Sequence, residues 1–428
     1  MDLSLPRGTS DLRPENSIQL KKLLSEAERI FRLYGFFPIE TPSIELTETL
    51  MAKAYGDENA KDIYLIEGKK EGLRYDLTVP LARFVASNKD IVLPFKRYQI
   101  GKVWRMDEPQ KMREREFYQA DIDIVGNTEI TAEAELISAT HKIITSVGIK
   151  NFDILINSRV LLANILLSFE IDLKLHVSIM RIIDKLDKIS YTEARTQIIS
   201  KGVPDNTAEK LLELITSEKS NENWIALFKS QVKNTSGEAE MLSEVLSLLE
   251  TYGIKNVKIT PSLSRGMDYY TGLVWEFVVY ENKKRLPTIA SGGRYDKLIG
   301  LYIRKDIPAV GSSIGVTRVL ELLGSSANKT YAEVFVSCIG KENLTYAVSI
   351  ASELRNNAIK TDMSLLSKGV SKQLDYANSL KIPFVIIIGN KEKQQNKATI
   401  KNMVTGTEEL LDINSIIKIL KNKKIQEW

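Results

Sequence analysis

The spacing of apolar residues predicts a helix near the beginning of the chain. Between Asn16 and Tyr34, apolar side chains recur every three or four residues, which places them on one side of a helix. Gly35 follows at once and is expected to end the helix. Residues 36–42 then form an extended segment that finishes at Pro42.

Two later runs, Phe95–Arg105 and Glu116–Val125, predict a pair of strands joined by a charged loop. Side chains along a strand point alternately to its two faces. In the second run, one face would carry Phe117, Gln119, Asp121 and Asp123, and the other Tyr118, Ala120, Ile122 and Ile124. The second of these faces is expected to lie in the core.

The polar face has two interpretations. It is either the solvated side of an antiparallel sheet, where charged residues usually lie, or a surface that receives a polar ligand. In the second case Gly101 and Arg105 of the preceding strand would lie beside the ligand. Lys111, Arg113 and Arg115 in the joining loop would add charges suited to phosphate groups.

The pattern changes farther along the chain. From about residue 173 to residue 250 the sequence is helical, polar and almost free of strand-like runs. Strands return at Leu273–Tyr280, and a strand followed by a helix spans Pro308–Leu323. After residue 330, strand-like and helical runs alternate as far as Ile388, which predicts a small α/β domain with parallel strands.

The composition limits the chemistry. The 428 residues are 43% apolar and 27% charged, as in ordinary globular proteins, and a net charge of +4 does not by itself indicate a nucleic-acid partner. Cys338, His141 and His176 are the whole supply of cysteine and histidine, which excludes an internal disulfide and a Cys/His zinc site. No apolar run is long enough for a membrane span, and the N-terminus lacks the core of a signal peptide, so a cytoplasmic protein is expected.

Three further segments combine glycine with charged or aromatic residues. Ser264–Gly272 contains the string Arg-Gly-Met-Asp-Tyr-Tyr, which without other context is a turn before a strand. Ser291–Asp296 contains two glycines that would let the backbone approach a ligand closely. The run Pro308–Leu323 places Gly311 and Gly315 ahead of Arg318, a string that is weak evidence by itself.

Taken together, these segments resemble the signatures of class II aminoacyl-tRNA synthetases, and in particular of the histidyl-tRNA synthetase family. The strand pair between Phe95 and Val125 is similar to motif 2, Pro308–Leu323 to motif 3, and the first helix with residues 35–42 to motif 1. Ser264–Gly272 and Ser291–Asp296 resemble two signatures specific to the histidyl enzymes. Asp76, Thr78 and Asp123 look like the archaeal and eukaryotic branch of the family.

The resemblance implies a role for each site residue. Arg105 and Arg265 would be catalytic and contact the α-phosphate of ATP from two sides, while Arg113 and Arg318 would bind other parts of ATP. Mg²⁺ would lie on the β- and γ-phosphates, with no protein metal site expected. The residues implied to bind histidine are Asp76, Thr78, Arg105, Gln119, Asp123, Arg265, Tyr269 and Tyr270.

An α+β architecture is implied as well. An antiparallel-sheet catalytic core would comprise residues 1–172 and 251–325, interrupted by a helical insertion at 173–250 and followed by a C-terminal α/β anticodon-binding domain at 330–428. The expected function is the ATP-dependent activation of L-histidine to histidyl-adenylate and its transfer to the 3′-end of tRNA(His). The expected assembly is a homodimer that does not associate with membranes.

Two alternatives are open, the first of them a non-catalytic protein and the second another enzyme of the same class. A non-catalytic paralogue, such as the regulatory subunit of ATP phosphoribosyltransferase, would usually have lost parts of motif 2 and of the Arg-Gly-x-Asp-Tyr-Tyr string, and would lack the C-terminal domain. A class II synthetase for glycine, proline or threonine would keep the three motifs without the two histidyl signatures.

Lys368–Lys372 imitates a class I signature, but the histidine-containing partner motif is missing and an ordinary loop is the simpler interpretation.

Overall fold

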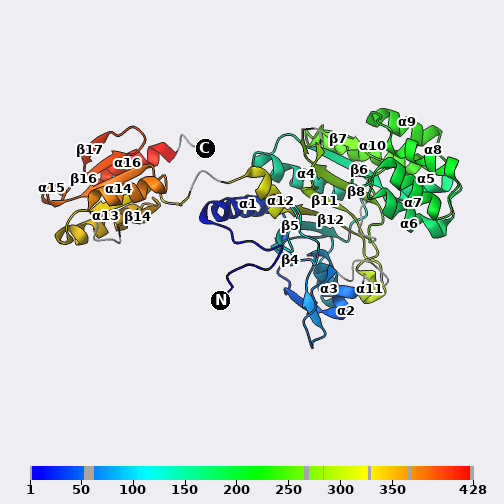
Figure 1. Ribbon diagram of the computed structural model, residues 1–428, viewed down its shortest axis with the longest axis horizontal. Helices are drawn as coiled ribbons and strands as arrows, with labels where there is room; N and C mark the ends of the chain where they lie inside the picture. Colours follow the sequence, from blue (N-terminus) through cyan, green and yellow to red (C-terminus); the bar gives the residue numbers. More distant parts are fainter. Residues whose placement is uncertain are drawn as a thin grey trace. The chain divides into compact units, whose positions relative to one another are not determined.

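The computed structural model describes residues 2–52, 62–264, 269–282, 284–325, 329–364 and 369–424. The chain divides into two compact units, one formed by Met1–Asp11 and Lys22–Leu323 and the other by Leu12–Lys21 and Gly324–Trp428. Each unit is built around a sheet of its own (Figure 1).

An eight-stranded sheet runs through the described part of the first unit, in the order β1-β4-β5-β12-β11-β8-β6-β7. Neighbouring strands are antiparallel except for the pairs β1–β4 and β6–β7, which are parallel. The antiparallel core predicted for this part of the chain is therefore confirmed. The strands are β1 (Phe37–Pro38), β4 (Phe95–Trp104), β5 (Glu116–Val125), β6 (Asp153–Ser158), β7 (Val257–Ile259), β8 (Leu273–Val278), β11 (Ala290–Arg294) and β12 (Ala309–Gly315).

The first predicted helix is present as α1 (Pro14–Leu33). Gly35 ends it with φ +74°, a backbone conformation that glycine adopts without strain. The apolar side of the helix is buried, and the ring of Phe31 lies 5.4 Å from that of Tyr98 on β4. This packing fixes the helix against one face of the sheet.

Helix α4 (Thr131–Ser146) covers the same face. The Tyr34 hydroxyl, just after α1, is 2.8 Å from the Ser138 hydroxyl of α4. Thr140 of α4 and Ser312 of β12 also share a hydrogen bond of 2.8 Å. Two helices thus shield one side of the sheet, which leaves the other side for the site described below.

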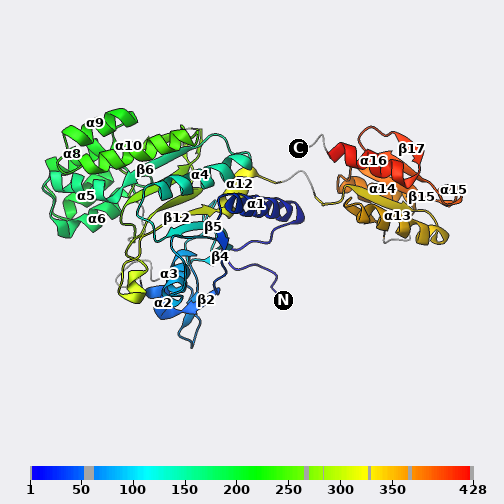
Figure 2. The same ribbon diagram turned by 180° about the vertical axis from the view of Figure 1, so that it is seen from behind.

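Between β6 and β7 the described chain is helical, and helices α5 to α9 gather at one end of the unit (Figure 2). Serine side chains begin three of these helices, because Ser158, Ser190 and Ser220 each accept a hydrogen bond from a backbone N–H in the first turn of the helix. Stacking of Trp224 on Phe228 with ring centroids 5.3 Å apart helps to form their shared core. The helices are α5 (Arg159–Ser168), α6 (Leu173–Ile183), α7 (Tyr191–Ser200), α8 (Asp205–Thr216), α9 (Asn221–Ser230) and α10 (Ser236–Thr251).

Shorter elements complete the first unit and form walls around the sheet. Two small antiparallel pairs, β2–β3 and β9–β10, are separate from the main sheet. These elements are β2 (Ile44–Leu46), α2 (Thr47–Met51), β3 (Glu71–Leu73), α3 (Thr78–Ser87), β9 (Tyr280–Glu281), β10 (Lys284–Arg285), α11 (Gly300–Ile303) and α12 (Val316–Leu323).

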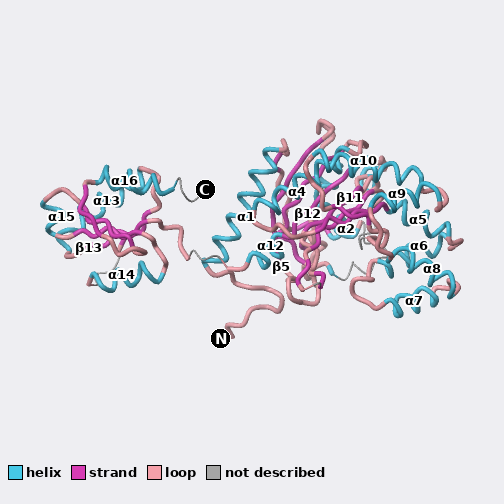
Figure 3. Tube along the Cα trace, turned by 90° about the horizontal axis from the view of Figure 1, so that it is seen from above, coloured by secondary structure: helices cyan, strands magenta, loops and turns pink. Residues whose placement is uncertain are grey.

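The second unit has a five-stranded sheet in the order β14-β13-β15-β16-β17. Its first three strands, which correspond to the predicted strand-like runs, are parallel as expected, and β16 and β17 are antiparallel to their neighbours. A short turn joins β16 to β17 and reverses the chain, while the connection from β15 to β16 contains the short helix α15 (Asn390–Gln394). Helices α13 and α16 lie on one side of the sheet and α14 on the other (Figure 3). The elements are β13 (Val334–Cys338), α13 (Leu344–Asn356), β14 (Thr361–Met363), α14 (Val370–Ser379), β15 (Phe384–Ile388), α15 (Asn390–Gln394), β16 (Ala398–Asn402), β17 (Glu408–Leu411) and α16 (Ile413–Lys424).

Candidate active site

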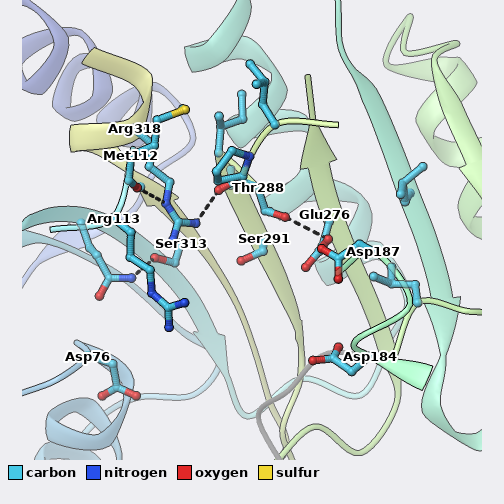
Figure 4. Close-up of a pocket in the computed structure, with 18 of the residues that line it drawn as sticks. Asp76, Met112, Arg113, Asp184, Asp187, Glu276, Thr288, Ser291, Ser313 and Arg318 are labelled. Atoms are coloured by element: carbon cyan, nitrogen blue, oxygen red, sulfur yellow. Dashed lines mark hydrogen bonds between the residues drawn. The ribbon is translucent and has the colours of Figure 1, made fainter. Parts of the chain in front are cut away.

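A cavity of about 1120 Å³ lies against the face of the eight-stranded sheet that α1 and α4 leave uncovered. Figure 4 shows Asp76, Arg113, Ser313 and Arg318 on one side of it, with Asp184 and Asp187 on the other. Arg265 lies outside the described residues. The other predicted site residues all line this cavity: Asp76, Thr78, Arg105, Arg113, Gln119, Asp123, Tyr269, Tyr270 and Arg318.

The floor of the cavity is formed by β5, as its alternation predicts. Gln119, Asp121 and Asp123 line the cavity, while Ala120 and Ile122 are buried on the opposite face. Of the two interpretations of the polar face, solvation is wrong, because all three polar side chains are at most 9% exposed. Buried groups of this kind need partners.

Asp123 is held by two residues that the sequence analysis did not identify. Nη2 of Arg97, on β4, lies 2.6 Å from its Oδ2, and the Tyr295 hydroxyl donates to its Oδ1. Burial raises the pKa of Asp123, and the Arg97 guanidinium opposes that rise. A signal for Arg97 existed, since in an antiparallel pair the residue opposite Asp123 points to the same face.

Asp121, also outside the predicted set, is buried next to Asp123. Burial raises the pKa of its carboxyl to about 7, against the attraction of Arg97. The Ser313 side chain of β12, directly opposite Asp121, hydrogen-bonds to it. Two buried carboxylates beside one arginine make the floor electrostatically negative.

At the edge of the cavity, Asp76 uses its two oxygens differently. Oδ1 accepts a hydrogen bond of 2.9 Å from the backbone N–H of Val79, in the first turn of α3. Oδ2 is buried and has no hydrogen-bond partner among the residues that the structure describes. Thr78, the first residue of α3, also lines the cavity.

Unpartnered acceptors converge on the same space. Asp76 Oδ2, Gln119 Oε1 and Asp121 Oδ1 are all buried without a hydrogen-bond partner in the described part of the chain. An unpaired buried acceptor costs free energy of roughly 1–3 kcal/mol, and such groups are rare in folded proteins. The cavity is therefore suited to a ligand with several N–H donors.

Arginines supply positive charge at the wall nearest the motif 2-like loop. Nε of Arg105 donates to the Tyr75 carbonyl (2.9 Å), and its guanidinium lies 5.1 Å from the ring centre of Phe117. No carboxylate of the described residues pairs with Arg105, so its charge is available to an anion. Arg113 differs, because it is paired with Asp107 at 2.8 Å. Arg115, a third cation of this loop, does not line the cavity.

Arg318 is fixed by backbone carbonyls on both sides. Its Nε donates to the Met112 carbonyl (3.1 Å) and its Nη1 to the Thr288 carbonyl (2.7 Å), as Figure 4 shows. These bonds hold the flat guanidinium in one plane at the cavity wall. A planar cation in this position is suited to stacking on a ring or to pairing with a phosphate.

Three tyrosines form an aromatic corner. The ring centres of Tyr269 and Tyr270 are 4.6 Å apart, and Tyr269 meets Tyr295 edge-on at 5.6 Å. Tyr295 links this corner to the floor through its hydrogen bond to Asp123. Aromatic side chains with a hydrogen-bonding end are suited to a small aromatic ligand.

The glycines of the segment Ser291–Asp296 do not have the role expected from the sequence. A Cβ at Gly292 would lie 2.3 Å from the Trp275 ring, and one at Gly293 would lie 2.7 Å from Tyr270. The space beside these two glycines is filled by protein side chains, so they permit packing of the sheet rather than the approach of a ligand. At Gly311 of β12 a Cβ would lie 2.0 Å from Asp123 Oδ1.

A second region of the cavity was not predicted. Arg181, Asp184 and Asp187, around the end of α6, line it together with Glu276 of β8. Glu276 accepts hydrogen bonds from Arg285 and Thr288. The sequence held a signal for Glu276, the one charged residue in the otherwise apolar strand Leu273–Val278, but none for the end of α6.

Comparisons with known proteins agree with this geometry. Residues 8–319 match the family model described as histidyl-tRNA synthetase, and residues 333–423 match that of an anticodon binding domain. The chain is 38% identical to the histidine–tRNA ligase of Aeropyrum pernix over 96% of both chains, and 36% identical to that of Clostridium tetani over 98% of both.

Solved structures show the same similarity. The histidyl-tRNA synthetase of Nostoc sp. PCC 7120 superposes with a TM-score of 0.88 at 27% identity, covering 99% of this chain and 100% of that one. A Bacillus halodurans protein described as an ATP phosphoribosyltransferase regulatory subunit/histidyl-tRNA synthetase has a TM-score of 0.74 at 22% identity, covering 88% of this chain and 97% of that one; it shares the fold.

Proposed function

The chain belongs to the histidyl-tRNA synthetase family and is a histidine–tRNA ligase, and from this premise we propose how its residues divide the reaction. L-Histidine, ATP and tRNA(His) are its substrates. The observation that carries the proposal is the meeting, in one cavity, of three buried acceptors with the cation Arg105, where among the described residues the acceptors have no hydrogen-bond donor and Arg105 has no carboxylate partner. An amino acid offers the complementary groups, an ammonium and a carboxylate.

Histidine would lie over the floor of the cavity. Asp76 Oδ2 is an unpartnered oxygen that can receive the α-ammonium group, with Thr78 beside it. Gln119 Oε1 can accept a second N–H. Asp123 keeps lone pairs for an imidazole N–H, because a carboxylate offers about four acceptor sites, and Tyr269 and Tyr270 would flank the ring.

In the first reaction step, a carboxylate oxygen of histidine would attack the α-phosphorus in line while pyrophosphate leaves. Arg105 would contact the α-phosphate and the histidine carboxylate, and Arg265, outside the described residues, would contact the α-phosphate from the opposite side. Positioning and charge neutralisation, rather than a protein nucleophile, lower the barrier of such a step. In the second step the terminal ribose 3′-hydroxyl of the tRNA would attack the activated carbonyl and release AMP.

The adenine would lie against Arg318, whose plane is fixed by two carbonyls. Arg113 would leave Asp107 and contact a phosphate of ATP.

Mg²⁺ would accompany ATP. The described residues contain no cluster of three metal-binding side chains, but Mg²⁺ is commonly held by substrate phosphates, water and one or two carboxylates. Glu276 lines the cavity and fits that need, and the ion would neutralise phosphate charge.

The proposal extends to the domain boundaries, the assembly, the branch of the family and the location of the protein. Residues 1–172 and 251–325 would form the catalytic core, 173–250 an insertion and 330–428 the anticodon-binding domain, in agreement with the matched ranges 8–319 and 333–423. Helix α1 with residues 35–42 would form the interface of a homodimer. Asp76 and Asp123 support the archaeal and eukaryotic branch, although the overall identities to archaeal and bacterial relatives are alike. No described helix is both long and apolar enough to cross a bilayer, and we propose a cytoplasmic location.

ATP–pyrophosphate exchange measured with each of the twenty amino acids tests this assignment. Histidine alone is expected to stimulate exchange. A pocket built to hydrogen-bond a substrate N–H rejects analogues without it by about 10⁴–10⁵ in rate. Stimulation by another amino acid would indicate a different class II synthetase, and no stimulation would indicate a non-catalytic paralogue.

A further inference from the structure

A chain of three polar side chains crosses from β5 to β12 beneath the proposed histidine site. Gln119 Nε2 donates a hydrogen bond of 2.7 Å to Ser313 Oγ. Ser313 lies directly opposite Asp121 in the sheet and hydrogen-bonds to its carboxyl. All three residues line the cavity, and Gln119 and Asp121 are 9% and 2% exposed.

The donor and acceptor capacities of these three side chains fix the direction of the hydrogen bonds between them. A carboxylate only accepts hydrogen bonds, and a serine hydroxyl has a single proton. That proton must go to Asp121 when Asp121 is charged, so Ser313 Oγ meets Gln119 as an acceptor. The amide nitrogen of Gln119 therefore points to Ser313, and its Oε1, which is buried without a partner, is left facing the cavity.

We propose that Asp121 and Ser313 are positioning residues, which hold the Gln119 amide so that its oxygen accepts an N–H of bound histidine. This inference rests on the proposed function, because it takes histidine as the ligand of the cavity. Without these hydrogen bonds, the Gln119 amide would be free to rotate by half a turn and present its NH₂ group, a donor, to the donors of the substrate.

The direction of the chain depends on the charge of Asp121. A protonated Asp121 can donate to Ser313, whose proton then turns toward Gln119 and favours the reversed amide. The charged groups that face Asp121 are Arg97 from β4, Asp123 from β5, Asp76 from the turn before α3 and the buried Arg74, which follows β3. Burial raises the pKa of Asp121 to about 7, so the change falls within the range in which the enzyme can be assayed.

Three variants test the proposal: Ser313→Ala, Asp121→Asn and the double variant. The matched control is Thr140→Val, which removes a buried hydroxyl hydrogen bond of 2.8 Å to Ser312, the neighbouring serine on the same strand. Histidine-dependent ATP–pyrophosphate exchange gives kcat, the KM for histidine and the KM for ATP. Thermal unfolding of each variant shows that it is folded.

The KM for histidine is expected to rise about five- to tenfold in Ser313→Ala, which is the size of one hydrogen bond, and less in Asp121→Asn, whose amide oxygen can still accept the proton of Ser313. The kcat and the KM for ATP should stay within about twofold, and the double variant should resemble Ser313→Ala, because both residues act through one amide. In wild type, kcat/KM for histidine should fall more steeply below pH 7 than in either variant. The titration of the substrate histidine itself affects the profiles of wild type and variants equally, so it does not account for a difference between them.

Some outcomes overturn the inference. An unchanged KM in Ser313→Ala, additive effects in the double variant, an equal rise in Thr140→Val, or pH profiles identical to wild type would each show that the chain does not orient Gln119. If Asp121→Asn does not fold, Ser313→Ala decides alone. A wild-type protein without histidine-dependent exchange would instead refute the proposed function, which is a separate result.

Discussion

Arg97 and Asp123 form an ion pair in which Nη2 lies 2.6 Å from Oδ2, and the two side chains are 0% and 2% exposed. The pair joins β4 to β5 under the cavity, and Tyr295 adds a hydrogen bond to the other oxygen of Asp123. A buried carboxylate without a counter-ion would favour its neutral form. The floor of the site is therefore charged only because Arg97 lies beneath it.

Replacing Arg97 tests this dependence. Arg97→Met should lower the free energy of unfolding by roughly 3–5 kcal/mol, because it leaves Asp123 buried without its partner. Urea unfolding measures the change. In the double variant Arg97→Met/Asp123→Asn much of the loss should be recovered, since Asp123 no longer carries a charge and only Asp121, whose raised pKa already favours the neutral carboxyl, has lost its counter-ion. A double variant as unstable as the single one would show that packing, rather than charge, explains the effect.

Replacing Asp76 should affect the binding of histidine much more than the stability of the fold. Asp76→Asn keeps an oxygen to accept from the Val79 N–H but loses the negative charge proposed to meet the ammonium group. We expect the KM for histidine to rise about 10- to 100-fold, corresponding to roughly 1.5–3 kcal/mol for a charge-assisted hydrogen bond. Asp172→Asn is the control, because Asp172 also caps a helix through Oδ1 but is exposed. Equal kinetic effects in both variants would contradict the role of Asp76.

Arg105 should matter for the reaction and little for folding. Arg105→Gln is expected to lower kcat/KM for histidine-dependent exchange by about 10²–10³-fold, the loss of one transition-state donor. The unfolding midpoint should change little. Arg115→Gln serves as control, because Arg115 lies in the same loop and also donates through Nε to a backbone carbonyl, but does not line the cavity. Similar losses in both variants would argue for a general effect of charge.

Gly311 is expected to tolerate no side chain. In Gly311→Ala the new methyl group would lie 2.0 Å from Asp123 Oδ1, so the carboxylate or the strand must move. Histidine-dependent exchange should fall by at least about tenfold, and stability by roughly 1–3 kcal/mol. Gly237→Ala, in α10 with nothing within 4 Å of the new Cβ, should instead be neutral or stabilising. Full activity in Gly311→Ala would refute the geometry of the floor.

Asp121 should make stability depend on pH. Its pKa is raised from 3.8 to about 7 in the folded state, so between these values the folded protein binds more protons than the unfolded chain. Stability from this group is thus present at low pH and is lost as the pH rises to about 7. Relative to wild type, the free energy of unfolding of Asp121→Asn should rise by roughly 2 kcal/mol from pH 5 to pH 8. Urea unfolding at both pH values measures this difference. A constant difference would mean that Asp121 titrates normally.

The sequence by itself determined the elements and the chemical inventory. Helix α1, the strands β4 and β5 and the alternation that brings Gln119 and Asp123 to one face all follow from local spacing, because side-chain direction in a helix or strand is a local property. The resemblance to family signatures selected residues far apart in the chain, and those that the structure describes meet in one cavity.

Only the tertiary structure decided which partners these residues have. The pairing register placed Arg97 opposite Asp123 and Ser313 opposite Asp121, and the packing of Trp275 and Tyr270 against Gly292 and Gly293 gave those glycines a structural role. Register, burial and the resulting pKa values depend on contacts between distant segments. Local pattern carries no information on such contacts, so the partners of the floor residues and the position of the end of α6 could not be read from the chain alone.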